Sequence, residues 1–130
     1  DALLTHAGLA AVMKRARGVQ VALVSCGDFS AQSLLAATPT VAEHLAELQA
    51  AGAVGDLLGT FLDAAGTPVA HPLNRRVMAL PPADLAGVPG SILASGGLNK
   101  APVIRAILRA GYVRRLVTDE AVAQALMEDA

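Results

Sequence analysis

The fold is decided by the stretch Ile92-Leu93-Ala94-Ser95-Gly96-Gly97-Leu98-Asn99-Lys100, in which an apolar strand runs into a turn of small residues. Residues 101–110 follow with the apolar spacing of a helix. Such a turn leaves backbone N–H groups uncovered at the positive end of a helix dipole, where an anion is favoured. Lys100 adds a positive charge there and is one of only two lysines beside eight arginines. The stretch therefore predicts a binding site for a phosphate or a carboxylate, although a tight turn followed by a solvated lysine is the alternative.

Alternating helix and strand patterns surround this stretch. The predicted strands are 19–24, 91–94 and 113–117, and the predicted helices are 9–17, one from Thr40 to Ala51, 81–85, 100–110 and one that starts at Thr118-Asp119-Glu120. Strand 19–24 is almost wholly apolar, which suits a parallel sheet covered on both faces. Segments 57–62 and 75–80 are expected to form a hairpin, because Ala65-Gly66-Thr67-Pro68 supplies turn residues between them.

Two of these helices carry explicit expectations for their side chains. Thr40-Val41-Ala42-Glu43 has the capping-box pattern, and its helix is expected to turn Val41, Leu45 and Leu48 inward. In the helix 100–110, the side chains expected to face the core are Val103, Ile104, Ile107 and Leu108. The whole pattern predicts an α/β fold, three-layered with a mainly parallel sheet and a small β-hairpin excursion, in a single domain of residues 1–130.

Composition excludes several classes of protein. Hydrophobic residues make up 54% of the chain and aromatic residues only 2%, so rings that could stack on single-stranded bases are nearly absent. A net charge of −1 offers no general attraction to nucleic acid, and no apolar run is long enough to cross a membrane. One cysteine excludes an internal disulfide, and no signal peptide is visible. A cytoplasmic location is therefore expected.

Two further segments carry candidate ligand-binding residues. Gly55 and Asp56 stand at the entrance of a strand, where Asp56 could accept hydrogen bonds from sugar hydroxyls or simply cap a turn. The segment Ser25-Cys26-Gly27-Asp28 follows a buried strand, at the position where open α/β sheets bind ligands, and Cys26 and Gly27 are its candidate residues. Cys26 is expected to be a pocket-lining or buried thiol, because a nucleophilic role would need a base beside it.

The histidines point to no catalytic or metal site. His6, His44 and His71 are scattered, and no H-x-x-x-H or C-x-x-C pair occurs. No catalytic residue, metal or cofactor is therefore expected. The polar segment His71-Pro72-Leu73-Asn74 is interpreted as a structural turn, with recognition of a ligand or a neighbouring subunit as the alternative.

These motifs together resemble the sugar-binding domain of SorC-type bacterial transcriptional regulators, from about residue 9 to residue 127. The segments that carry the resemblance are Gly52-Ala53-Val54-Gly55-Asp56-Leu57-Leu58-Gly59, Phe61-Leu62-Asp63 with Gly66, His71-Pro72-Leu73-Asn74 with Arg76-Val77, Ser95-Gly96-Gly97 with Lys100, Ile104-Arg105-Ala106 and Leu116-Val117-Thr118-Asp119-Glu120-Ala121. The resemblance implies a fold similar to sugar-phosphate isomerases and glucosamine-phosphate deaminases. It also implies a phosphorylated sugar as effector, a homo-oligomer (dimer or tetramer), and DNA contact only through a separate helix-turn-helix domain.

Two motifs transfer roles to single residues. The family's G-G-x-x-K motif matches Gly96, Gly97 and Lys100 and implies that Lys100 binds the effector's phosphate, while the acid of G-A-V-G-[DE] matches Asp56 and implies hydroxyl binding. The chain departs from the family at Ser25-Cys26-Gly27, where G-I-G is usual, and no basic residue occurs in 28–38. The match covers only the later part of the family's domain.

Three functional classes follow from these observations. The first is a regulatory domain of a transcriptional regulator that senses a phosphorylated sugar, and the others are a sugar-phosphate isomerase or deaminase and an oligomerisation module without a ligand. The expected ligand-binding residues are Gly96, Gly97, Leu98, Asn99, Lys100, Asp56, Gly55, Cys26 and Gly27.

Overall fold

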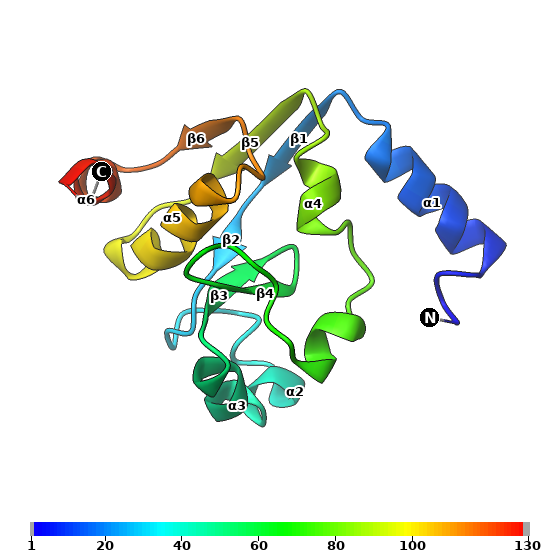
Figure 1. Cartoon of the computed structure of the whole chain (residues 1–130), viewed down its shortest axis with the longest axis horizontal. Helices are drawn as coiled ribbons and strands as arrows, with labels where there is room; N and C mark the ends of the chain where they lie inside the picture. Colours follow the sequence, from blue (N-terminus) through cyan, green and yellow to red (C-terminus); the bar gives the residue numbers. More distant parts are fainter. Residues whose placement is uncertain (1, 129–130) are drawn as a thin grey trace.

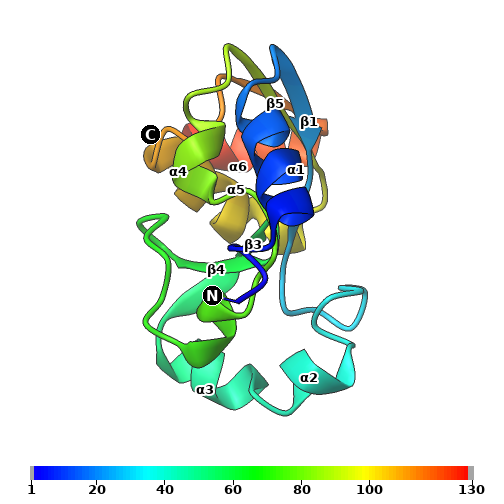
Figure 2. The same ribbon diagram turned by 90° about the vertical axis from the view of Figure 1, so that its right-hand side faces the viewer.

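The computed structural model describes residues 2–128 and confirms the predicted α/β class. Its elements in chain order are α1 (Ala7–Arg17), β1 (Val21–Val24), β2 (Cys26–Gly27), α2 (Pro39–Ala42), α3 (Leu45–Ala50), β3 (Ala53–Leu57), β4 (Thr60–Asp63), the 3₁₀ helix η1 (Pro72–Arg75), α4 (Pro82–Leu85), β5 (Gly90–Ala94), the 3₁₀ helix η2 (Leu98–Lys100), α5 (Ala101–Arg109), β6 (Arg115–Val117) and α6 (Glu120–Glu128). Sheet A has the order β1-β5-β6 and is parallel, and sheet B has the order β2-β3-β4 and is antiparallel. In both views α2 and α3 lie at the end of the molecule away from sheet A (Figures 1 and 2).

The main core lies between sheet A, sheet B and α5. Because side chains alternate along a strand, Ser91 and Leu93 of β5 share one face of sheet A, and both are fully buried. The core on this face is formed by Cys26, Leu57, Leu62, Leu85, Val88, Leu93, Val103, Ile104, Ile107, Val113 and Val122. Helices α4, α5 and α6 thus all contribute to the same side of the sheet.

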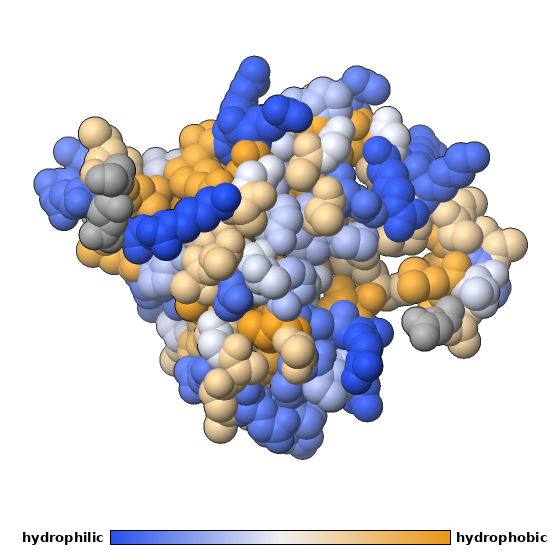
Figure 3. All heavy atoms as spheres, in the orientation of Figure 1, coloured by the Kyte–Doolittle hydropathy of each residue, from blue (hydrophilic) through white to orange (hydrophobic). Residues whose placement is uncertain are grey.

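The other face of sheet A is open. Val21, Leu23 and Val117 alternate with core-facing neighbours, and their exposed fractions are 64%, 70% and 60%. The prediction that strand 19–24 is covered on both faces is therefore wrong for residues 2–128, because α4, α5 and α6 all pack on the first face. More apolar surface appears beside the start of α1 (Figure 3), where Leu3 and Leu4 are exposed.

The predicted hairpin of 57–62 with 75–80 is wrong, and a hairpin forms instead from β3 and β4. β3 and β4 pair through the two-residue turn Leu58-Gly59, whose φ angles of 54° and 81° are both positive. Such turns match the twist of the flanking strands, so the segment 57–62 contains a turn rather than one strand. Residues 75–80 form no strand, since η1 ends at Arg75 and the chain then runs on irregularly.

The helix predicted from Thr40 is divided in two. Helix α2 ends at Ala42, His44 adopts a φ of −107° and a ψ of 5°, and α3 begins at Leu45. The capping box does not form, because Thr38 rather than Thr40 occupies the N-cap and its side chain makes no capping hydrogen bond. Val41 and Leu48 are buried as predicted, whereas Leu45 is half-buried. The second core cluster comprises Val41, Leu48, Ala53, Phe61, Val69 and Leu73.

Helix α5 fixes the position of the candidate site. Val103, Ile104 and Ile107 are fully buried as predicted, but Leu108 is 37% exposed and does not face the core. Pro102 lies in the first turn, where no intrahelical hydrogen bond is lost. Because α5 contacts all three strands of sheet B, the turn that precedes it lies beside β2 and β3.

Candidate ligand-binding site

A cavity of about 550 Å³ lies where three segments of the chain meet. It is lined by Ser25, Cys26, Gly27, Asp28, Gln32, Ser33, Leu34, Leu35, Asp56, Leu58, Gly96, Gly97, Asn99 and Lys100. Its position beyond the carboxyl ends of β1 and β5 is where open α/β sheets bind ligands. The structure therefore brings together seven of the nine predicted site residues. Gly55 and Leu98 do not line the cavity.

The turn Gly96–Lys100 is only partly available to an anion. The Gly97 N–H donates to Oδ2 of Asp119 at 2.6 Å, and the Lys100 N–H donates to the Gly97 carbonyl at 2.9 Å. Among residues 2–128, the N–H groups of Gly96, Leu98 and Asn99 have no acceptor within hydrogen-bonding distance. The expectation that the whole turn offers free amides is corrected to these three, because the Gly97 N–H donates to Asp119, which also caps α6 through the Val122 N–H.

Lys100 supplies the positive charge of the cavity. Its side chain is half-buried, and within the described chain no carboxylate oxygen lies within 4.0 Å of its ammonium group. Its charge nevertheless acts on the cavity, since it opposes the rise in the pKa values of Cys26 and Asp56. An ammonium group in this position can accept an anionic partner without first breaking an ion pair.

Asp56 is a buried carboxyl group on β3. Burial raises its pKa, against the opposing effects of a hydrogen bond from the Gly59 N–H and of the charge of Lys100. That N–H lies 3.0 Å from Oδ2 of Asp56. The second oxygen is left close to Gly27, at the wall of the cavity. The predicted role of Asp56 in binding hydroxyl groups stays a prediction, with a geometry that suits it.

Asp28 is a site residue that the sequence interpretation missed. It is buried, Oδ1 accepts the Ser30 hydroxyl at 2.9 Å, and Oδ2 accepts the Asn99 side-chain N–H at 2.8 Å. Burial acts to raise the pKa of Asp28, but the hydrogen bonds from Asn99 and Ser30 outweigh it, so the pKa lies below its ordinary value. Its place directly after Gly27 was the one available signal, because ligand contacts gather after strand ends.

Cys26 is held as a buried thiol. Burial raises its pKa, and its Sγ lies 3.4 Å from the Ser95 hydroxyl.

Gly55 has a packing role, since a Cβ there would overlap the Gly27 carbonyl oxygen and lie 2.8 Å from the Val103 side chain. Leu98 is exposed and is not part of the cavity lining. These placements favour a binding site without a nucleophile.

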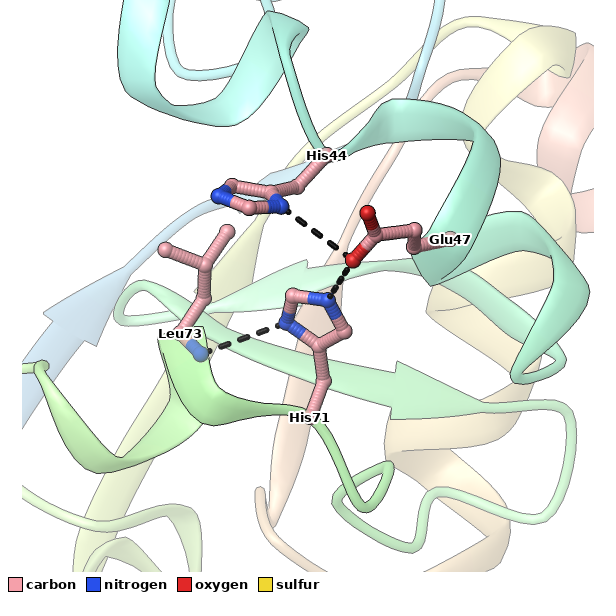
Figure 4. Close-up of polar contacts among 4 residues, drawn as sticks. All are labelled: His44, Glu47, His71 and Leu73. Carbon is pink, nitrogen blue, oxygen red and sulfur yellow. Dashed lines mark hydrogen bonds and ion pairs between the residues drawn. The ribbon is translucent and has the colours of Figure 1, made fainter.

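A separate cluster forms where α3 meets the loop before η1 (Figure 4). Oε2 of Glu47 lies 3.2 Å from Nδ1 of His44 and 3.0 Å from Nε2 of His71. These three ligand-type atoms lie within 4.8 Å of one another, so the histidines are less scattered than the sequence suggested. The Leu73 N–H donates to Nδ1 of His71 at 3.2 Å, which puts the proton of the neutral ring on Nε2, facing Glu47. A metal would need the lone pair there, so the arrangement favours a hydrogen-bonded clamp.

Replacing Glu47 with glutamine tests the clamp. Hydrogen bonds from His71 and then His44 lower the pKa of Glu47 from its ordinary 4.5. The ionised carboxylate therefore contributes stability above about pH 4.5, and this contribution is lost as the pH falls through the lower folded-state pKa. We expect Glu47→Gln to reduce the urea midpoint at pH 7, and we expect the difference from the unmodified chain to shrink as the pH falls below 4.5. Glu128→Gln, an exposed acid at the end of α6, is the control, and an equal effect of both variants would contradict the clamp.

Comparison with known proteins assigns the chain to a family. The Sugar-bind family model, which describes a sugar-binding domain, matches residues 1–128. The chain belongs to the sugar-binding domain family. The resemblance to the sugar-binding domains of SorC-type regulators is thereby confirmed.

Relatives of this sugar-binding domain are regulators of transcription or catabolism. The erythritol catabolism regulatory protein EryD of Brucella abortus is 31% identical over 98% of this chain and 40% of its own length. The transcriptional regulator LsrR of Escherichia coli K12 is 40% identical over 58% of this chain and 24% of its own length. The chain thus spans well under half the length of these curated relatives.

Solved structures show the same fold. A transcriptional regulator from Streptococcus pneumoniae TIGR4 superposes with a TM-score of 0.87 and 27% identity, over 99% of this chain and 50% of that one. The sugar-binding domain of a transcriptional repressor from Vibrio fischeri superposes with a TM-score of 0.84 and 29% identity, over 98% of this chain and 51% of that one. Within residues 2–128 of this sugar-binding domain, no helix combines the length and apolarity needed to span a bilayer.

Proposed function

We propose that the chain is the effector-binding part of a transcriptional regulator and that its effector is a phosphorylated sugar. The observation that carries this proposal is one cavity that contains the ammonium group of Lys100 and the buried carboxyl groups of Asp28 and Asp56. Among residues 2–128, that ammonium group has no ion-pair partner. A sugar phosphate has the complementary chemistry, with an anionic end and several hydroxyl donors. Membership of the sugar-binding domain family supports the sugar part of the proposal.

Each part of the ligand has an assigned partner. The phosphate contacts Lys100 and the unpaired amides of the turn, and each charge-assisted hydrogen bond contributes about 1.5–3 kcal/mol. The hydroxyl groups donate to Asp56 and Asp28. A ligand held in this way joins the Gly96–Lys100 turn to the segment after β2, two loops already linked by Asn99 and Asp28.

Binding acts by shifting populations rather than by breaking bonds. A ligand that bridges two loops favours the arrangement in which both loops are close together. In a homo-oligomeric regulator whose DNA-binding domain lies elsewhere in the protein, that preference changes operator binding as a coupling free energy. The same reasoning supports a role in the cytoplasm, where operators and sugar phosphates occur together.

An isomerase or deaminase is the second candidate, and one observation favours it. The raised pKa of buried Asp56 is the kind of shift that general bases show. The lined cavity offers no histidine as a partner acid, however, which favours the regulatory proposal. Isomerisation or deamination of ribose, glucosamine or fructose phosphates, abolished by Asp56→Asn, would overturn the proposed function.

Thermal unfolding with a panel of sugar phosphates tests the proposal directly. A ligand present at a hundred times its Kd stabilises the folded chain by about 2.7 kcal/mol, so we expect a rise in Tm of several degrees for at least one compound. The unphosphorylated sugars serve as controls and are expected to give a smaller shift. If no compound raises Tm at millimolar concentration, an oligomerisation module without a ligand becomes the better assignment.

A further inference from the structure

The charges in the cavity are unevenly divided. Its lining contains three charged side chains, and two of them, Asp28 and Asp56, are acidic. Lys100 is the single cationic residue in that lining, and the segment 28–38, which forms one wall, contains no lysine or arginine. The lining therefore has one cationic partner for a phosphate group and no second cationic side chain.

The Asp28 carboxylate is held in place by hydrogen bonds and can still accept one from a ligand. Ser30 and Asn99 each donate one hydrogen bond, and they reach different oxygens of the carboxylate. A carboxylate can accept about four hydrogen bonds. The backbone of Asp28 and Ser30 also favours the charged form, so only part of this capacity is left for a hydroxyl donor from a ligand. The bond to Asn99 also ties Asp28 to the turn that carries Lys100, which sets the position of the carboxylate relative to the ammonium group.

We infer that Asp28 is a specificity-determining residue, which accepts a hydroxyl group from the ligand and excludes ligands with a second phosphate. A hydroxyl donor satisfies the remaining lone pairs, whereas a second phosphate would bring like charges together in a buried place. The cavity then selects polyhydroxylated ligands with one anionic end. This inference rests on the proposed function and narrows it to monophosphates.

Matched pairs of ligands test the inference by calorimetry on the whole chain. The pairs are fructose 6-phosphate and fructose 1,6-bisphosphate, glucose 6-phosphate and glucose 1,6-bisphosphate, and ribulose 5-phosphate and ribulose 1,5-bisphosphate. We expect the monophosphate of the best-binding pair to bind at least tenfold more tightly than its bisphosphate. Asp28→Asn, which keeps the size and one acceptor but removes the charge, is expected to bring that ratio close to one.

Controls separate specificity from folding and from the proposed function. Glu43→Gln removes one negative charge from the surface and is expected to leave the ratio unchanged. Circular dichroism shows whether Asp28→Asn is folded. Ser30→Ala removes one side-chain donor to Asp28 but keeps its charge, and is expected to keep the preference for the monophosphate. Two outcomes would overturn this inference while leaving the proposed function standing. One is equal or tighter binding of the bisphosphate, and the other is an unchanged ratio of monophosphate to bisphosphate affinity in a folded Asp28→Asn. Failure of all six ligands to bind overturns the proposed function, and this inference with it.

Discussion

Replacing Lys100 with alanine is expected to weaken sugar-phosphate binding about ten- to a hundredfold, because one charge-assisted hydrogen bond of about 1.5–3 kcal/mol is lost. The fold should be unaffected, since the ammonium group forms no ion pair within the described chain and is not part of a core cluster. Titration calorimetry measures the Kd, and urea unfolding measures the stability.

The matched control for this change is Lys14→Ala, which removes the other lysine of the chain. Lys14 is an exposed residue in the last turn of α1 and does not line the cavity. We expect wild-type affinity from it. If Lys100→Ala also binds with wild-type affinity, Lys100 is not part of the site. The proposed phosphate contact then lacks its main partner.

Gly55→Ala is expected to destabilise the fold by about 3 kcal/mol, the range of an overpacked core. The added Cβ would overlap the Gly27 carbonyl oxygen and press on Val103 of α5, and neither the β2–β3 pair nor α5 can move without disturbing the main core. Urea unfolding followed by circular dichroism gives the free energy of unfolding. A stable Gly55→Ala chain that loses ligand binding would instead restore the ligand-binding role predicted from the G-A-V-G-[DE] motif.

Gly18→Ala is the control for that substitution. Gly18 has a φ of −93°, and a Cβ there would make only an ordinary contact, 3.6 Å from the Arg15 carbonyl oxygen. We expect a change within about 0.5 kcal/mol, as for an unstrained surface site. The comparison separates the effect of crowding at Gly55 from the general loss of a glycine.

Local signals in the sequence predicted the elements that depend on neighbours in the chain. Helix α5 follows from its apolar spacing, from Pro102 in its first turn and from Gly111 after its end, and residues of the turn before it line the cavity. The hairpin turn was not predicted because Leu58 adopts a positive φ, a conformation that is uncommon for a leucine.

Contacts between distant residues were beyond sequence reasoning. Asp28 and Asn99 are 71 positions apart, and Glu47 and His71 are 24 apart, so no spacing rule connects them. Asp119 takes the Gly97 amide from a distance of 22 positions, which is why the turn offers fewer free amides than its glycines suggest. The packing role of Gly55 could not be predicted for the same reason, since the atoms that crowd it belong to β2 and α5.

The open face of sheet A affects self-association of the chain in solution. Val21, Leu23 and Val117 are exposed apolar side chains on a face that parallel sheets normally cover, and such surfaces promote self-association. Melting temperatures of the isolated chain should therefore vary with its concentration, and the effect of a ligand is best measured on a dilution series. Charged substitutions on that face, such as Leu23→Glu, should reduce self-association without changing a residue that lines the cavity.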